Sequence, residues 1–307
     1  MLDKKTCYLQ MSDGHEVFVT TYIPSEKAIG HMHILHGMAE HSARYEHFAE
    51  FLCDEGYSVS MHDHRGHGAT AEQNGQFGFF AEEDGFERVV RDVFEVIESL
   101  RQQLDIKSLT LFGHSMGSFI ARRFIQQYSY LLDNVILSGT GAVKPLHLAG
   151  NVLAKQLVKV KGATVESPLL DKLSFGNFNN KIENAKTSFD WLSTDEEQVQ
   201  KYIQDEKCGF IATTQFFADL TDGLLMLNKV SENSRIRPSL PILLVSGSED
   251  PVGDAGKGVV QVGQQLQEAG LEKVKVYLFE GKRHEILNER NKKYSYEMIV
   301  RWLKDGK

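Results

Sequence analysis

Hydrophobic and polar residues along the chain follow two different periods. Segment 16–23, EVFVTTYI, alternates with the period of two that is typical of a half-buried strand. From Phe86 to Leu100, apolar residues instead recur every three to four positions, as on one face of a helix. The predicted strands are 16–23, 31–37, 56–64, 109–112, 133–139, 240–247 and 273–281, with helices predicted around 45–52, 86–100 and 119–127 and between the last two strands.

Strands that alternate with helices predict an α/β fold with a mostly parallel sheet covered on both sides. The alternation stops between Gly141 and Arg237, in a helix-leaning, loop-rich stretch. We interpret residues 141–237 as an inserted helical lid (cap) over the carboxyl edge of the sheet, where α/β proteins bind ligands, and 1–140 with 238–307 as the core. The Phe and Trp residues of this lid are Phe175, Phe178, Phe189, Trp191, Phe210, Phe216 and Phe217.

Aromatic residues in the lid have two interpretations. Some of them, with Phe178 and Phe217 as candidates, could line a pocket for an acyl chain. Alternatively, they only pack the lid onto the core.

Composition excludes several classes of function. The chain has a net charge of −8 and no cluster of Lys and Arg, which argues against nucleic acid as a partner. The first twenty residues lack an apolar signal-peptide core, and no segment is long and apolar enough to span a bilayer. Three widely separated cysteines fit reduced thiols better than disulfides. The sequence therefore predicts a cytoplasmic protein.

The pentapeptide GHSMG places Ser115 between Gly113 and Gly117. It follows the apolar run 109–112 and precedes an amphipathic segment, so the setting is strand, turn and helix. On such a turn a serine adopts a strained backbone conformation, and side chains at the two glycine positions would collide with the neighbouring strand and helix. The pattern predicts that Ser115 is a nucleophile.

A nucleophilic serine needs a histidine as base and a carboxylate to orient it, and on this type of turn they follow in the order acid, then histidine. His284 is the only histidine after His147, and it lies just past the strand 273–281. The preceding strand is followed by Glu249 and Asp250. We choose Asp250, which Pro251 follows, with Glu249 as the alternative.

The transition state of acyl transfer also needs donors for its oxyanion, usually two backbone N–H groups. One should belong to Met116, the residue after the nucleophile. The other should belong to Met38 in the loop after an early strand, where Gly37 allows the turn. The alternative is that His36 and Gly37 only end a strand.

A metal-dependent alternative lies in HDHRGHG. His62, His64 and His67 have the H-x-H-x-x-H spacing of a zinc hydrolase, in which the metal would activate water. However, Gly66 stands where such enzymes carry an aspartate, and no second ligand set follows. The sequence favours a glycine-rich turn at this position and predicts no metal.

Five segments in order, HGMAEHSARY, HDHRGHGAT, GHSMGSF, SGSEDPVG and EGKRHEILNE, resemble the α/β-hydrolase group that contains monoacylglycerol lipases and bacterial lysophospholipase-like esterases. The resemblance implies the α/β-hydrolase fold, with Ser115, Asp250 and His284 as the triad. It also places Glu40 and Arg44 near the glycerol-binding end of the pocket, although an exposed i, i+4 pair on a helix is the alternative. Ala39 and Ser118 depart from the glycines that are commoner at those positions in the group.

These observations together predict a serine hydrolase that cleaves carboxylic esters of an acyl chain with a small alcohol head group, such as monoacylglycerols or lysophospholipids, through an acyl-enzyme. No cofactor is needed. The expected partner is the small-molecule ester, with at most transient contact between the lid and a membrane surface. Amide or thioester cleavage by the same triad is an alternative, and a binding protein without catalysis is a third interpretation.

Overall fold

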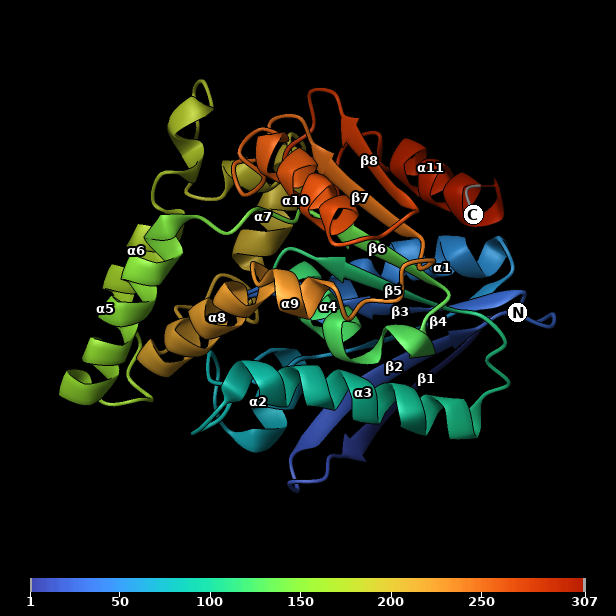
Figure 1. Cartoon of the computed structure of the whole chain (residues 1–307), viewed down its shortest axis with the longest axis horizontal. Coiled ribbons are helices and arrows are strands. Elements are labelled where there is room, and N and C mark those ends of the chain that lie inside the picture. Colours follow the sequence, from blue (N-terminus) through green and yellow to red (C-terminus); the bar gives the residue numbers. More distant parts are fainter. Residues whose placement is uncertain (1, 306–307) are drawn as a thin grey trace.

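Eight strands form a single sheet in the computed structural model, which describes residues 2–305 (Figure 1). Their order is β1-β2-β4-β3-β5-β6-β7-β8; β2 pairs antiparallel with both β1 and β4, and all pairs from β4 to β8 are parallel. The sheet is thus mostly parallel, as predicted. The strands are β1 (Asp3–Gln10), β2 (Glu16–Ile23), β3 (Gly30–Leu35), β4 (Tyr57–His62), β5 (Leu109–His114), β6 (Asn134–Ser138), β7 (Ile242–Gly247) and β8 (Val274–Phe279).

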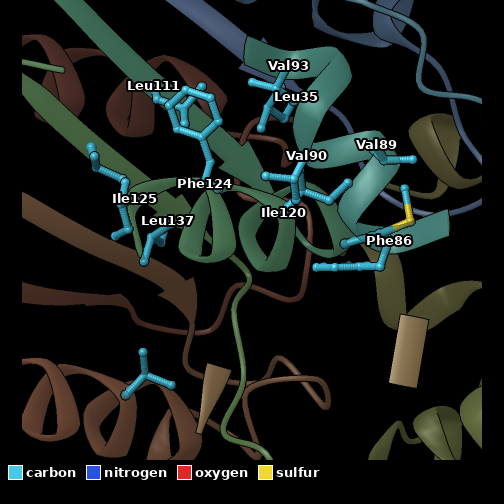
Figure 2. Close-up of a cluster of buried hydrophobic side chains, with 14 of the residues drawn as sticks. Leu35, Phe86, Val89, Val90, Val93, Leu111, Ile120, Phe124, Ile125 and Leu137 are labelled. Atoms are coloured by element: carbon cyan, nitrogen blue, oxygen red, sulfur yellow. The ribbon is translucent and has the colours of Figure 1, made fainter. Parts of the chain in front are cut away.

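Adjacent residues of the central strands face opposite sides of the sheet, and each side has its own core. On one side Leu111 packs against α3 and α4, where Val90, Val93 and Phe124 meet it (Figure 2). On the other side, Phe112 packs with residues of α1 and α11. The helices of the core are α1 (Glu46–Asp54), α2 (Gly68–Asn74), α3 (Gly85–Gln103), α4 (Met116–Tyr128), α10 (Lys257–Glu268) and α11 (Lys292–Asp305), with 3-10 helices η1 (Ser42–Tyr45) and η2 (Ser129–Leu131).

The inserted segment lies between the adjacent strands β6 and β7. Its helices are α5 (Pro145–Lys161), α6 (Pro168–Phe175), α7 (Glu196–Gln204), α8 (Thr214–Leu227) and α9 (Val230–Asn233), with 3-10 helices η3 (Phe178–Lys181) and η4 (Asp190–Leu192). Helix α8 packs against α3, α4 and α5, whereas α5 and α6 lie at the left of Figure 1, far from α11. Helix α8 therefore packs the inserted segment onto the helices on one side of the core.

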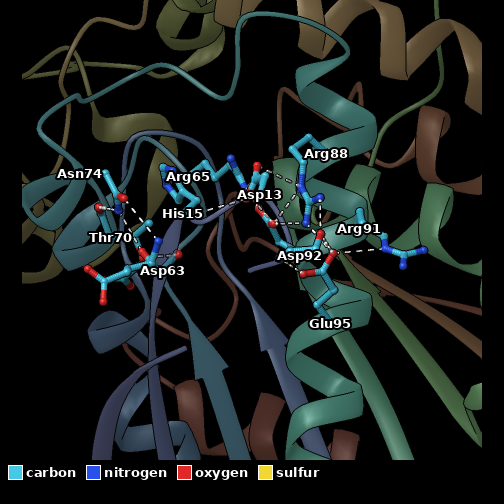
Figure 3. Close-up of polar contacts among 12 residues, drawn as sticks. Asp13, His15, Asp63, Arg65, Thr70, Asn74, Arg88, Arg91, Asp92 and Glu95 are labelled. Atoms are coloured by element: carbon cyan, nitrogen blue, oxygen red, sulfur yellow. Dashed lines mark hydrogen bonds and ion pairs between the residues drawn. The ribbon is translucent and has the colours of Figure 1, made fainter. Parts of the chain in front are cut away.

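The loop after β4 is fixed to α3 by buried charges. The guanidinium of Arg65 is 4% exposed and donates to Asp92 (2.5 Å) and Asp13 (2.8 Å). Arg88 donates to Asp92 and Glu95, which completes the network in Figure 3. Buried ion pairs of this kind hold a loop in one position, because separating either partner would leave an uncompensated charge.

No helix within residues 2–305 is both long and apolar enough to cross a membrane.

Candidate active site

Ser115 lies on the sharp turn between β5 and α4, with φ 53° and ψ −119°. A Cβ atom at Gly113 would lie 2.3 Å from the carbonyl oxygen of Gly117. A Cβ atom at Gly117 would lie 2.3 Å from the carbonyl oxygen of Leu35 in the neighbouring strand β3. The predicted steric reason for both glycines is therefore confirmed, and Ser115 has the strained backbone conformation predicted for it.

Asp250 and His284 form a buried pair. His284 Nδ1 lies 2.9 Å from Asp250 Oδ1, and both side chains are almost inaccessible to water. Asp250 also accepts hydrogen bonds from Ser246 Oγ (2.6 Å) and the backbone N–H of Val252 (2.9 Å). Glu249, by contrast, is exposed. The loop after β7 thus turns only the aspartate toward the histidine.

The pair has opposite pKa shifts. Burial acts to lower the pKa of His284, but the carboxylates of Asp250, Glu285 and Glu40, Asp250 foremost, together leave the pKa above its ordinary value. Burial acts to raise the pKa of Asp250, but His284 and its hydrogen-bond donors leave that pKa lowered. An aspartate that stays ionised beside the imidazole favours one tautomer and stabilises the imidazolium when a proton is taken up at Nε2.

One pocket contains Ser115, His284 and the loop after β3. Its lining includes Gly37, Met38, Ala39 and Glu40 of that loop. A Cβ atom at Gly37 would lie 3.2 Å from Cβ of Ser115, so the loop passes directly beside the serine. The structure therefore brings the serine, the histidine and one predicted oxyanion loop to a single cavity.

The two predicted oxyanion amides belong to the two segments on either side of the pocket's serine, the loop after β3 and the start of α4. Met38 lines the pocket, and Met116 is the first residue of α4, where N–H groups lack a partner within the helix. The turn itself differs from expectation: Ala39, rather than Gly37, has the positive φ, 52°. Gly37 is closely packed instead: a Cβ there would lie 2.7 Å from Glu40 Oε1, which would have to shift.

Ala39 is held in this conformation by the inserted segment. Its carbonyl oxygen accepts hydrogen bonds from Tyr202 Oη and from the backbone N–H of Gly209, each at 2.9 Å. His41, two residues further on, pairs with Asp205 at 2.8 Å. The inserted segment and the oxyanion loop are thus bonded to each other beside the pocket.

Glu40 and Arg44 do not form an exposed helix pair. Glu40 is 2% exposed, and its carboxylate accepts from Gly37 N–H (2.5 Å), Tyr45 Oη (2.8 Å) and Arg44 Nη1 (2.5 Å). Arg44 also donates through both Nη atoms to Glu285, at 2.6 and 2.7 Å. Sequence reasoning missed Glu285, because only the tertiary fold brings it to Arg44.

The aromatic residues that line the pocket, apart from histidines, are Phe175, Trp191, Tyr202 and Phe210. The two candidates from the sequence lie elsewhere: Phe178 packs edge-on against Trp191, and Phe217 lies in the core at 3% exposure. Trp191 also contacts the His284 ring, with centroids 5.0 Å apart. The helical period of 214–227 could have identified Phe217 as a core residue, but nothing in the sequence orients the loop around Trp191.

His62, His64 and His67 belong to the core. All three are fully buried, His62 Nδ1 lies 2.9 Å from His33 Nε2, and His67 Nδ1 donates to the carbonyl of Arg65. Within residues 2–305, the metal-ligating side chains whose ligand atoms come within 4.8 Å of one another are His41, Asp205 and Cys208. The H-x-H-x-x-H spacing therefore does not produce a set of converging ligands.

Buried histidines on β3, β4 and the loops after them make the fold sensitive to acid. Burial lowers their pKa values, to about 4 for His31 and His62, to about 3 for His36 and His67, and well below 6.5 for His33 and His64. Above pH 6.5 these histidines are neutral in both the folded and the unfolded chain, so they do not reduce the free energy of unfolding. Between pH 6.5 and the pKa of the folded state, only the unfolded chain binds protons at these histidines. Each histidine therefore lowers the free energy of unfolding by about 1.4 kcal/mol per pH unit.

We expect the melting temperature to fall steeply between pH 7 and pH 5, because several histidines act together. Thermal melts across this range provide the measurement. In His33→Gln, which removes one of these groups, the fall per pH unit should be smaller than in the wild type. A melting temperature that stays constant down to pH 5 would contradict the account.

Comparisons with known proteins all place the chain among the α/β hydrolases. Residues 26–291 match the family described as "Serine aminopeptidase, S33". The chain is 30% identical to the monoglyceride lipase of Homo sapiens over 92% of this chain and 84% of that protein. It is 26% identical to the monoacylglycerol lipase of Mycolicibacterium smegmatis, over 94% of this chain and 93% of that protein.

A solved structure agrees with this match. The crystal structure of a thermostable carboxyl esterase from Bacillus coagulans, in complex with glycerol, superposes with a TM-score of 0.92 at 28% identity and covers 98% of both chains. The fold is accordingly the α/β-hydrolase fold that the sequence predicts. The chain belongs to the serine aminopeptidase S33 family of α/β hydrolases and is a hydrolase related to lipases and esterases.

Proposed function

We propose that the protein is a serine carboxylic-ester hydrolase in which Ser115 is the nucleophile, His284 the general base and Asp250 the residue that orients the histidine. The observation that carries the proposal is the buried His284–Asp250 pair, at 2.9 Å, whose histidine lines the same pocket as a serine on a strained strand-to-helix turn. These three roles are what nucleophilic catalysis by serine requires.

The reaction has two halves. Ser115 Oγ attacks the ester carbonyl while His284 Nε2 takes its proton, and the oxyanion accepts hydrogen bonds from the N–H groups of Met38 and Met116. The proton then passes to the leaving alcohol, and the acyl group stays on Ser115. Water, deprotonated by His284, attacks the acyl-enzyme and releases the fatty acid. No cofactor takes part in these steps.

The substrates we propose are esters of acyl chains with small alcohol head groups, monoacylglycerols or lysophospholipids. Two relatives are named as lipases of monoacylglycerols, and the similar esterase was solved in complex with glycerol. The pocket supports an acyl substrate, because Phe175, Trp191 and Phe210 give it an apolar wall.

We further propose that residues 141–237 act as a lid that makes transient contact with a membrane surface. Helices α5 and α6 expose Leu146, Leu148, Val152, Val160, Leu169 and Leu173. Exposed apolar side chains in this number favour contact with lipid. Cosedimentation with phospholipid vesicles tests the proposal: replacing Leu146 and Leu148 with Ser should reduce the bound fraction, and equal binding would reject it.

Amide cleavage by the same triad is a second candidate, because the matching family is described as serine aminopeptidases. Assay of a matched aminoacyl anilide and ester discriminates the two. We expect faster hydrolysis of the acyl ester.

The length of the acyl chain provides the test of the substrate class. Each methylene buried against the aromatic wall adds up to about 0.8 kcal/mol to binding, so kcat/KM should rise several-fold per two carbons until the pocket is full. Phe175→Ala and Phe210→Ala should flatten this rise more than they lower acetyl-ester hydrolysis. The measurement is the slope of log kcat/KM against chain length for p-nitrophenyl esters.

Phe178→Ala is the matched control, since Phe178 packs against Phe175 and Trp191 but does not line the pocket. Its slope should stay close to that of the wild type, and thermal melts check that each variant folds. A wild-type slope near zero would reject acyl esters as the substrate class. Equal losses on short and long esters would show that the aromatic wall has only a structural role.

A further inference from the structure

The charged residues that line the active-site pocket are all acidic apart from the histidines. Glu40, Asp171 and Glu285 contribute carboxylates, and the lining, all of it within residues 2–305, contains no Lys or Arg. The three come from separate parts of the fold: the loop after β3, helix α6 of the inserted segment and the loop that carries His284. The pocket is therefore negatively charged on more than one wall.

The guanidinium of Arg44 lies behind this lining and pairs with two of the three carboxylates. Arg44 is bonded to both Glu40 and Glu285, and its guanidinium lies over the Tyr202 ring, 4.9 Å from the centroid. The carboxylate of Glu40 accepts hydrogen bonds from Gly37, Arg44 and Tyr45. Two carboxylates around one guanidinium leave a formal charge of −1.

Asp171 adds a third carboxylate that this cation does not neutralise. It is half-buried at the start of α6, and burial raises its pKa. A positive group in the pocket would favour the ionised form of Asp171, so that the two would stabilise each other.

We infer that the pocket selects among the proposed ester substrates by charge, with Glu285 and Asp171 as the specificity residues. It prefers a cationic alcohol head group to a neutral one and disfavours an anionic one, including a lysophospholipid head group with a net negative charge. The inference rests on the proposed ester hydrolysis. At separations of 6–8 Å inside a partly buried site, one carboxylate changes the relative binding of a cation by about three- to tenfold. The same field repels the carboxylate of the released fatty acid and so assists product release.

Glu285 should also act on the reaction itself. It directly follows His284. Burial lowers the pKa of that histidine, Asp250 raises it most, and Glu285 is the next group that raises it. Glu285→Gln should therefore shift the kinetic pKa of the histidine downward on a neutral substrate. A role limited to packing would leave the pH profile in place.

The test compares three esters of one acyl chain that differ only in the alcohol: choline, its uncharged isostere with a tert-butyl group in place of trimethylammonium, and an alcohol of similar size that bears a carboxylate. The wild type should show the highest kcat/KM on the choline ester and the lowest on the anionic one. The ratio of choline to neutral ester should fall about threefold or more in Glu285→Gln and in Asp171→Asn.

Glu249→Gln is the matched control, because Glu249 is an exposed carboxylate outside the pocket lining; its ratio should equal that of the wild type. Asp171→Asn keeps the test usable if Glu285→Gln fails to fold, because Asp171 takes no part in the Arg44 ion pairs. Hydrolysis of all three esters at equal rates, or a ratio unchanged in both variants, would overturn the inference but leave the proposed function intact. No hydrolysis of any ester, neutral ones included, would instead reject the proposed function.

Discussion

Replacing Ser115 with alanine should lower kcat for ester hydrolysis by about 10⁴-fold or more while leaving the fold unchanged. Only the hydroxyl oxygen is lost, and the alanine keeps the same backbone turn. Without that oxygen the acyl-enzyme cannot form, so the remaining rate reflects only binding and the oxyanion amides. Steady-state hydrolysis of a p-nitrophenyl ester provides the measurement.

Ser118→Ala is a suitable control in the same helix. Ser118 is fully buried and donates a hydrogen bond to the carbonyl of Ser115, so its loss removes a hydroxyl from the same region. It should reduce the rate by less than about tenfold, since one such bond contributes about 1 kcal/mol. Comparable losses in the two variants would mean that Ser115 acts through structure alone.

Replacing Asp250, the proposed acid of the triad, should also have a large effect. Asp250→Asn should lower kcat by about 10³- to 10⁴-fold, because an amide can donate to His284 Nδ1 and so favour the wrong tautomer. Glu249→Gln, at the neighbouring exposed position, should change kcat by less than about twofold. Parallel kinetics on the two variants provide the measurement.

The pH profile separates this role of Asp250 from a loss of packing. Without the carboxylate, the main group that raises the pKa of His284 is gone, so the acid limb of the kcat profile should move to lower pH. Equal losses in the two variants, or an unshifted profile in Asp250→Asn, would contradict the assignment.

Much of the fold could be predicted because the central strands are buried and bounded by turn residues. Seven of the eight strands coincide with apolar segments of the sequence, and segment 16–23 matches β2 residue for residue. Strand β1 was missed because nearly all its side chains are exposed, so no apolar alternation marks it. Helices α2 and α11 were also missed: α2 is short, and its apolar face is limited to Ala71.

Within the site, the backbone motif was predictable and the supporting contacts were not. The glycines beside Ser115 are imposed by local collisions, and the order of acid and histidine follows from the loops after β7 and β8. The left-handed conformation of Ala39 in the loop after β3 was not predicted, because it depends on hydrogen bonds from Tyr202 and Gly209, far away in sequence. Side-chain direction within the inserted segment, which decides between Phe175 and Phe178, likewise depends on tertiary packing.

The most direct test of the central claim is covalent trapping of the nucleophile. The protein is incubated with a fluorophosphonate, its intact mass is measured, and peptides are mapped to find the modified residue. We predict a single adduct on Ser115 in the wild type and no adduct in Ser115→Ala. An adduct on another residue, or equal labelling of Ser115→Ala, would contradict the account.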